Sequence, residues 1–352
     1  MKILRRYITV HLAWVTLLAL FALVALFSFF ELIDELGDVG KGTYGIPQVL
    51  LYIFLSMPRL AYELFPIAAV IGAMTVLGVM ARNSELDVIR TSGVSRLKLA
   101  GLMARAGLLP LIIAVVIGEF IAPSAEETAQ QMRSVATTEQ ITLKTKYGLW
   151  VRDGNSFINI RTVLPDNRVN EVYIYEFDDS NRLRSSLFAE SAAYRDNRWV
   201  LQHVRQTRIS EERVRSEQFN IVTRDALLAP EVINFIAIKP RYLTLWELIH
   251  YIRYLKDNAQ NTIIYEQALW AKVIRPFSII AMIILAVPLV RGNSRSTAIG
   301  QRVFIGAGAG IVFYLCNEIS GHLGVVYGFA PSVSAIAPTA ILIMIILFML
   351  RE

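Results

Sequence analysis

The sequence has little cysteine and few charged residues. Its one cysteine, Cys316, lies in an apolar run, so an intrachain disulfide framework is excluded. Only 18% of the 352 residues are charged, whereas 55% are hydrophobic and the mean hydropathy is +0.47. Soluble globular domains carry about a quarter charged residues. Because the apolar residues gather in runs long enough to cross a bilayer, the composition is typical of an integral membrane protein.

Sequence motifs for catalysis are also missing. The four histidines lie in separate regions, and no H-E-x-x-H motif or paired cysteine accompanies them. A catalytic metal is therefore not expected. The sequence has neither a G-x-x-x-x-G-K-[ST] phosphate loop nor a G-x-S-x-G nucleophile elbow. We expect a protein that is not an enzyme by itself and needs no cofactor.

Six stretches reach the roughly 20 apolar residues that a membrane-spanning helix needs. They cover about 7–33, 50–81, 97–122, 271–290, 298–319 and 330–350. The first is too long for a secretory signal core and lacks a small-residue cleavage site, so we expect it to be retained. In the second, Pro58 and Pro66 each remove a backbone donor, and the start of that span is expected to be bent or interfacial.

The positive charge predicts the orientation of these spans. The formal net charge is +6, which by itself would suit a nucleic-acid partner. With the N-terminus inside, however, the inner side of the membrane part carries twelve bases and three acids, and its outer side, with residues 123–262 left out, carries four bases and eight acids. By the positive-inside rule both termini are cytoplasmic. The basic excess is thus a topology signal, and no nucleic-acid partner is expected.

The segment between the third and fourth spans changes character. We expect helices one to three over residues 1–122, an inserted domain over 123–262, and helices four to six over 263–352. Six short β-rich runs in the insertion, separated by Asp-, Asn- and Gly-rich turns, predict an antiparallel sandwich or jelly-roll on the outer side, outside the cytoplasm. They lie at 149–151, 157–160, 172–175, 186–189, 199–201 and around 219–222.

The inserted domain ends in an amphipathic helix predicted over residues 244–257. Thr244 and Glu247 form a T-x-x-E capping box before its apolar positions. This helix would connect the β-domain to the fourth span, either as a plain connector or as a mechanical element.

The loop after the second span predicts a short helix within residues 83–93. Glu85 and Asp87 fall in its first turn, where the helix dipole favours acids, Arg90 falls in its last turn, and Gly93 suits a left-handed stop. A helix this short is unstable alone, so it must dock on something. It is either an interfacial link between two spans or a coupling helix whose acids enter a groove on a cytosolic partner.

Four bases lie at the outer membrane boundary: Lys41, Arg59, Arg133 and Arg275. Bases at this depth commonly extend to lipid headgroups. Alternatively, some of them bind the phosphates of an anionic lipid cargo.

The fifth span carries Gly306 and Gly310 in small-xxx-small spacing. This spacing allows close helix packing, either within the subunit or against another one.

Taken together, these features resemble the LptF/LptG family of lipopolysaccharide-export permeases, and its LptG branch more than its LptF branch. The resemblance covers essentially the whole chain. It rests on the order of spans and β-domain, on the S-E-L-x-V-x-R-x-S-G pattern of 84–93, and on the segments 6–8, 40–44, 118–123, 147–154 and 326–328.

The resemblance implies a multi-pass subunit of an ABC exporter in the inner membrane of Gram-negative bacteria. The implied partners are an LptF-type permease, an LptB-type ATPase dimer that hydrolyses ATP, an LptC-type single-span protein and an LptA-type periplasmic bridge, with lipopolysaccharide as cargo. Glu85 matches the coupling-helix glutamate, and Arg59 and Arg133 fall where relatives place bases near the lipid phosphates. The β-domain would lie in the periplasm, and acyl chains would leave through or beside it.

The sequence departs from the family pattern at two places. Gly37-Asp38 stands where some members have adjacent lysines, and Gln130 occupies a position that can be arginine. The resemblance therefore implies fewer or differently placed phosphate contacts. Two functions remain open: a lipopolysaccharide extractor, and a subunit that relays ATPase motion without carrying lipid. A lipid-modifying enzyme is disfavoured because no acid/base or metal set is present.

Overall fold

The structure is a computed structural model. It describes residues 2–351 except 138–148, 154, 165–167, 179, 181, 196–197, 211–212, 226–239, 259 and 291–298. The helical elements are α1 (Lys2–Leu36), α2 (Ile46–Arg82), α3 (Glu85–Thr91), α4 (Arg96–Ala106), α5 (Leu108–Val116), the π-helix η1 (Ile117–Ile121), α6 (Ala122–Thr137), the 3-10 turn η2 (Pro240–Tyr242), α8 (Leu245–Asp257), α9 (Ile263–Leu289), α10 (Ile299–Tyr327) and α11 (Pro331–Arg351). The strands are β1 (Leu149–Asp153), β2 (Ser156–Leu164), β3 (Arg168–Phe177), β4 (Leu183–Arg195), β5 (Arg198–Ile209) and β6 (Val214–Asp225).

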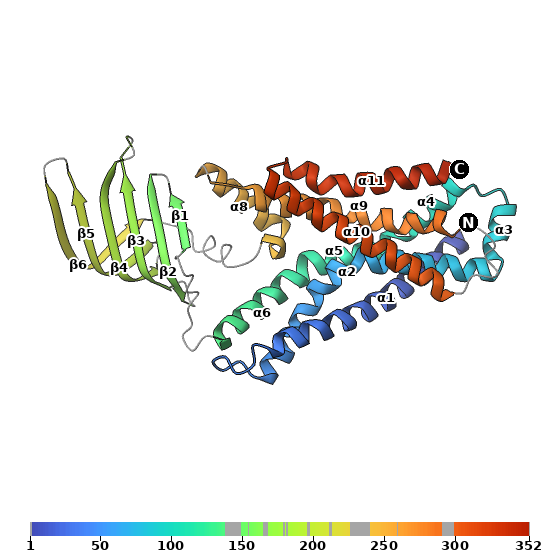
Figure 1. The fold of residues 1–352 in the computed structure, drawn as a ribbon, viewed down its shortest axis with the longest axis horizontal. Coiled ribbons are helices and arrows are strands. Elements are labelled where there is room, and N and C mark those ends of the chain that lie inside the picture. Colours follow the sequence, from blue (N-terminus) through green and yellow to red (C-terminus); the bar gives the residue numbers. More distant parts are fainter. Residues whose placement is uncertain are drawn as a thin grey trace.

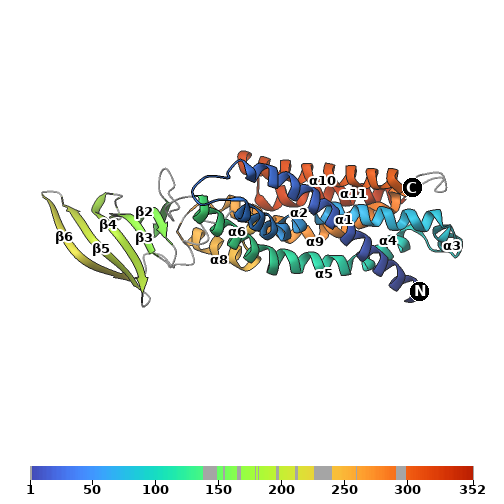
Figure 2. The same ribbon diagram turned by 90° about the horizontal axis from the view of Figure 1, so that it is seen from below.

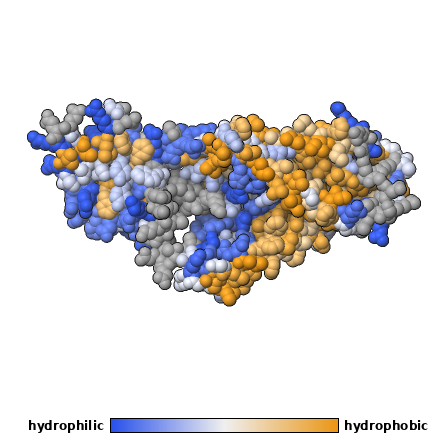
Figure 3. Space-filling view, viewed as in Figure 1, coloured by the Kyte–Doolittle hydropathy of each residue, from blue (hydrophilic) through white to orange (hydrophobic). Residues whose placement is uncertain are grey.

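Six helical segments of the described chain are long and apolar enough to cross a membrane, which confirms the six predicted spans. They are α1, α2, the run from α4 to α6, α9, α10 and α11. The β-sheet lies at one end of the elongated molecule, and α3 and both termini lie at the other (Figures 1 and 2). The surface is predominantly hydrophobic over the helical bundle and hydrophilic over the sheet (Figure 3).

Helix α2 forms the centre of the bundle and packs against α1, α6, α9 and α10. It runs from Ile46 to Arg82 as one continuous helix through Pro58 and Pro66. The two prolines, from which a bent or interfacial start of this span was expected, therefore do not interrupt the helix. A proline is tolerated in a membrane helix because neighbouring helices surround the freed backbone group, and the side chain of Pro66 is fully buried here.

The third span is longer than its hydropathy predicts. Its helix passes through the π-helical turn η1 and continues in α6 to Thr137, rather than ending near Ala122. Residues 124–137 are polar but favour helix, and α6 buries Ala129, Ala136 and the Glu126 side chain against the bundle. The apolar run therefore marks where the lipid-facing part ends, while the helix itself extends toward the β-domain.

All six predicted strands are present, and the fold class of a helical membrane protein with a β-domain between the third and fourth spans is confirmed. The described strands form one antiparallel sheet in the consecutive order β1-β2-β3-β4-β5-β6. Each described strand pairs with the next one along the chain, as in a series of hairpins. Because residues 138–148 and 226–239 of the insertion lie outside the described residues, the finer expectation of a sandwich or jelly-roll stays a prediction.

Helix α8 connects the sheet to the bundle. Thr244 and Glu247 form the predicted capping box, with the Thr244 nitrogen 2.7 Å from a Glu247 carboxylate oxygen and the Glu247 nitrogen 3.2 Å from the Thr244 hydroxyl. Tyr251 and Leu255 on α8 belong to the same hydrophobic core as sheet residues such as Ile174. The helix therefore packs on the sheet, and it contacts α9 as well.

Candidate functional site

Helix α3 is docked on the end of the bundle by two apolar side chains. Leu86 and Ile89 are 3% and 8% exposed and belong to the bundle core, whereas Val88 between them is 66% exposed. Gly93 has φ +83°, which confirms the left-handed stop predicted from the sequence. The amphipathic docking explains how so short a helix is stable.

The acidic first turn of α3 lies beside the end of α2. Asn83 caps the C-terminus of α2, and its side-chain nitrogen lies 3.3 Å from a Glu85 carboxylate oxygen. Glu85 and Asp87 are both partly exposed. Arg90 is part of α3, but its side chain lies outside the described residues. The helix thus presents two acids and one exposed apolar side chain at the end of the molecule farthest from the sheet (Figure 1).

Arg59 on α2 is held by acids from three helices. Its guanidinium lies 2.5 Å from Glu31 of α1, 3.7 Å from Glu63 of α2 and 3.0 Å from Glu126 of α6. The Arg59 side chain is 14% exposed and Glu126 is 1% exposed. Because its charge is already compensated by these three carboxylates, Arg59 is well placed to join the helices and has little free capacity for a phosphate.

Arg133 and Lys41 form a second cluster at the tips of α1 and α6. The Arg133 guanidinium lies 3.0 Å from Glu35 and 2.6 Å from Asp38, and the Lys41 ammonium lies 2.5 Å from Asp38. Hydrogen bonds from Lys41 and Arg133 lower the pKa of Asp38. Tyr44 donates to Glu35 over 2.9 Å. The acids of this loop therefore neutralise both predicted phosphate-binding bases.

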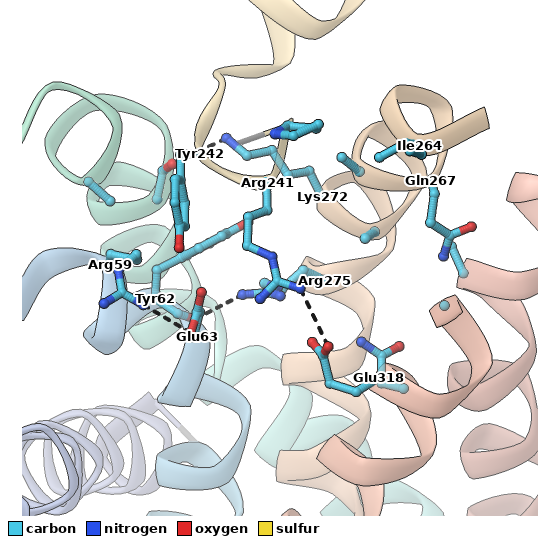
Figure 4. Close-up of a pocket in the computed structure, with 18 of the residues that line it drawn as sticks. Arg59, Tyr62, Glu63, Arg241, Tyr242, Ile264, Gln267, Lys272, Arg275 and Glu318 are labelled. Carbon is cyan, nitrogen blue, oxygen red and sulfur yellow. Dashed lines mark hydrogen bonds and ion pairs between the residues drawn. The ribbon is translucent and has the colours of Figure 1, made fainter. Parts of the chain in front are cut away.

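Arg275 has a different environment, in a cavity of about 440 Å³. The cavity lies between α2, α9, α10, α11, the α5–α6 bend and η2 (Figure 4). The Arg275 guanidinium donates to the Tyr62 carbonyl oxygen over 3.3 Å and lies 4.5 Å from the centre of the Tyr62 ring. Among the described residues it forms no ion pair with an acid. Of the four predicted bases, only Arg59 and Arg275 line this cavity, and of these two only Arg275 forms no ion pair among the described residues.

Arg241 of η2 also points into the cavity (Figure 4). Its guanidinium nitrogen lies 3.5 Å from Glu318 of α10, at the limit of a hydrogen bond. Although burial lowers the pKa of Arg241, the nearby carboxylates of Glu318 and Glu63 raise it by more, so the side chain stays charged. Burial raises the pKa of the neighbouring Tyr242 to about 12, so its hydroxyl remains a donor. The polar wall of the cavity therefore carries the guanidinium groups of Arg241 and Arg275 and the Tyr242 hydroxyl, together with the carboxylates of Glu63 and Glu318.

Glu119 in η1 joins three elements at the edge of this cavity. One carboxylate oxygen lies 3.1 Å from the Lys272 ammonium of α9. The other accepts a hydrogen bond from the backbone nitrogen of Leu245, the first residue of α8, over 2.5 Å. Such a π-helical turn is commonly found at functional positions. A Cβ atom at Gly118 would overlap the Tyr62 ring, so glycine is required for this approach of η1 to α2.

Sequence analysis did not single out Arg241, Lys272, Glu119 or Gln267 as site residues. Lys272 could have been recognised from the sequence, because an ionisable residue at the start of an otherwise apolar span usually has a functional role or a charged partner. Arg241 could not have been recognised in this way, because the insertion contains many charged residues and nothing in the sequence distinguishes this one. Only the folded chain brings η2 onto α9 and α10.

The two glycines of α10 pack inside the chain. Gly306 lies against Met74 and Ile71, and Gly310 lies against Ile67, all on α2. Gly308, on the other side of the helix, has open space around it. Of the two interpretations of this spacing, close packing within the subunit is what these contacts show.

This architecture defines a class: a multi-pass α-helical membrane protein with a β-domain inserted between its third and fourth spans. The sequence model of the family "Lipopolysaccharide export system permease LptF/LptG" matches residues 6–352. The chain belongs to this family and is a multi-pass inner membrane transport permease for lipopolysaccharide, a transport subunit rather than a catalyst.

Two curated relatives agree with the family assignment. The lipopolysaccharide export system permease protein LptG of Escherichia coli K12 is 32% identical over 353 residues, covering 99% of this chain and 98% of the relative. The protein of the same name from Haemophilus influenzae is 31% identical over 325 residues, covering 92% of this chain and 90% of the relative.

Proposed function

We propose that the chain is the membrane permease subunit of an ATP-driven exporter that extracts lipopolysaccharide from the inner membrane and passes it to a periplasmic bridge. ATP hydrolysis would occur in an LptB-type ATPase dimer. An LptF-type permease, an LptC-type single-span protein and an LptA-type bridge would complete the system. The family membership and the names of the relatives support this assignment.

The observation that carries the proposal is the docking of α3. Leu86 and Ile89 anchor the helix, and Glu85, Asp87 and Val88 remain accessible on the end opposite the β-sheet. This is the end where the basic inner-side residues lie, so we assign it to the cytoplasm and the sheet to the periplasm. An ATPase bound there can push on the second and third spans, which flank α3.

An energy source is required by the chemistry of the cargo. Each lipopolysaccharide molecule carries several acyl chains, and exposing apolar surface costs about 25 cal/mol per Å². Passive release along a protein surface does not supply this free energy. Because motifs for nucleotide hydrolysis are missing from the sequence, the energy comes from a partner.

The test is charge reversal in α3. Glu85→Lys and Glu85→Ala should reduce co-purification of the ATPase and lower export, while the melting temperature of the chain stays unchanged. Glu127→Lys on α6, at the opposite end of the bundle, is the matched control and should retain the ATPase. Normal ATPase retention by both Glu85 variants would refute the coupling assignment.

A second function, relay of ATPase motion without lipid passage, is supported by the contacts of Glu119. Through Lys272 and Leu245 this residue connects the third span, the fourth span and α8. The two functions differ in where cargo goes. Photocrosslinkers at inward-facing positions of α1 and α10 should capture lipopolysaccharide if the chain carries it, and should capture none if it only relays motion.

A further inference from the structure

The cavity beside Arg275 has the features of a binding site that cargo transport does not explain. Its volume of about 440 Å³ falls in the usual range for small-molecule sites. The cavity lies in the part of the bundle nearest η2 and α8, between α2, α9, α10 and α11. Arg59 and Arg133 form ion pairs with neighbouring acids, whereas Arg275 forms no ion pair among the described residues, and Glu63 and Glu318 line the same cavity.

The geometry points to an anionic group at Arg275. The Tyr62 carbonyl and ring hold one side of the guanidinium, leaving donors of the fork directed to the cavity. Arg241 enters the same cavity from η2, with only a 3.5 Å contact to Glu318. A phosphate oxygen is the acceptor that such a forked donor binds best.

Gln267 of α9 also lines the cavity, but its amide packs against α10. A Cβ at Gly321 would be 3.3 Å from the amide nitrogen, and a Cβ at Gly324 would be 3.7 Å from the Oε1 atom. The Oε1 atom is buried and has no hydrogen-bond partner among the described residues. A ligand in the cavity therefore binds the guanidinium groups and not this oxygen.

The mouth of the cavity faces the apolar surface of the bundle. His322 and Ile264, which line the cavity, are largely exposed, with the His322 side chain at 78%. Next to them on α10, Ile319, Leu323 and Val326 expose apolar surface. A ligand with its polar head inside the cavity would therefore place acyl chains along α10, at the depth where lipid lies.

We propose that this cavity binds the phosphate of one glycerophospholipid headgroup. The phosphodiester lies on Arg275 and Arg241. A single phosphodiester carries one negative charge, which matches one guanidinium without an ion pair. The doubly phosphorylated sugar head of lipopolysaccharide needs more charge and more space. This bound lipid is distinct from the cargo, and the inference does not depend on the transport proposal.

Native mass spectrometry of the full-length protein in detergent tests the site. Phosphatidylethanolamine, phosphatidylcholine and diacylglycerol with the same acyl chains serve as probes, because the first two carry the phosphodiester and diacylglycerol does not. Wild-type protein should bind one molecule of either phospholipid, and diacylglycerol more weakly. Arg275→Gln should weaken both phospholipids by about tenfold or more, which corresponds to one charged hydrogen-bonding group. The matched control Arg253→Gln, an exposed position on α8, should change nothing.

A second variant keeps the test valid if the first one does not fold. If Arg275→Gln does not fold, Arg275→Lys, which keeps the charge but not the fork, should still lower the affinity for both phospholipids.

Three results would overturn the assignment. Unchanged phospholipid binding in the Arg275 variants would exclude the cavity as the site. Displacement of the bound lipid by a lower concentration of purified lipopolysaccharide, with the same dependence on Arg275, would assign the cavity to cargo. Equal affinity for inorganic phosphate would show that the site takes free phosphate.

Discussion

The ammonium of Lys272 lies 3.1 Å from the carboxylate of Glu119, inside the junction where the β-domain meets the bundle. The Lys272 side chain is 7% exposed and that of Glu119 is 22% exposed. Since Glu119 also accepts a hydrogen bond from the first residue of α8, this ion pair fixes the start of the connecting helix relative to the third and fourth spans. The β-domain is thus attached to the bundle by a charged contact as well as by the chain itself.

Removing Lys272 should destabilise this junction. We expect Lys272→Met to lower the free energy of unfolding by about 2 kcal/mol, because it leaves the Glu119 carboxylate partly buried and unpaired. Denaturant titration of the purified full-length protein measures the change. Lys256→Met is the control: its ion pair with Glu266 involves a Lys256 side chain that is 61% exposed, so its loss should cost under about 1 kcal/mol. Equal costs for the two variants would contradict a structural role for the buried pair.

Arg59 should behave as a structural residue. Arg59→Gln leaves three neighbouring carboxylates without their shared cation, and we expect a loss of about 3 kcal/mol in stability. In the assembled transporter, basal and lipid-stimulated ATPase activity should then fall together. A phosphate-binding role predicts instead a selective loss of lipid stimulation with normal stability. Melting curves and ATPase assays with and without lipopolysaccharide distinguish the two.

Much of the fold could be predicted because it follows from local patterns. Apolar run length gives the six spans, β-rich runs give the six strands, and the Thr244–Glu247 capping box gives the start of α8. The end of the third helix at Thr137 could not be predicted from hydropathy, because its last turns bury only small residues and one acid. Strand spacing by itself predicts no strand order, because the order depends on which strands pair in the folded chain.

The site was harder to predict because its contacts join distant parts of the sequence. Arg59 and Glu63 are four residues apart, a spacing that predicts an ion pair along one helix. Glu31 and Glu126, in contrast, contact Arg59 only because α1, α2 and α6 pack together. A count of charged residues does not show which of them are buried. Arg302 is one of the twelve bases counted on the inner side, yet it is 5% exposed and donates to the Gly78 carbonyl over 2.7 Å.

The stability of the β-sheet should depend on pH through Glu176. Burial raises the pKa of this carboxyl, but hydrogen bonds from Ser185 and Arg224 lower it by more, so the folded-state pKa lies below the ordinary value of about 4.3. The stabilisation is complete above the unfolded-state pKa and is lost as the pH falls through the folded-state pKa.

Tryptophan fluorescence melting curves of the full-length protein between about pH 6 and pH 3 test this, since Trp199 is buried in the sheet core. Below the ordinary glutamate pKa the wild-type melting temperature should fall more steeply than that of Glu176→Gln. Glu190→Gln, whose side chain is 69% exposed, should follow the wild-type profile. A Glu176→Gln profile that parallels wild type would exclude this contribution.

The glycines of α10 allow a matched test of which face packs inside the chain. A Cβ at Gly310 would lie 2.9 Å from the Ile67 Cγ2 atom and 3.2 Å from its Cα, whereas a Cβ at Gly308 has open space. Gly310→Val should therefore lower stability by about 1–3 kcal/mol through overpacking, and Gly308→Val should change it by under about 0.5 kcal/mol. Both substitutions alter helix propensity equally, so the difference in denaturant midpoint reports the contact with α2.

If Gly308→Val leaves the chain stable but abolishes co-purification of an LptF-type permease, then the same helix packs inside the subunit through Gly310 and between subunits through Gly308. Equal destabilisation by both variants would contradict the assignment of the two faces.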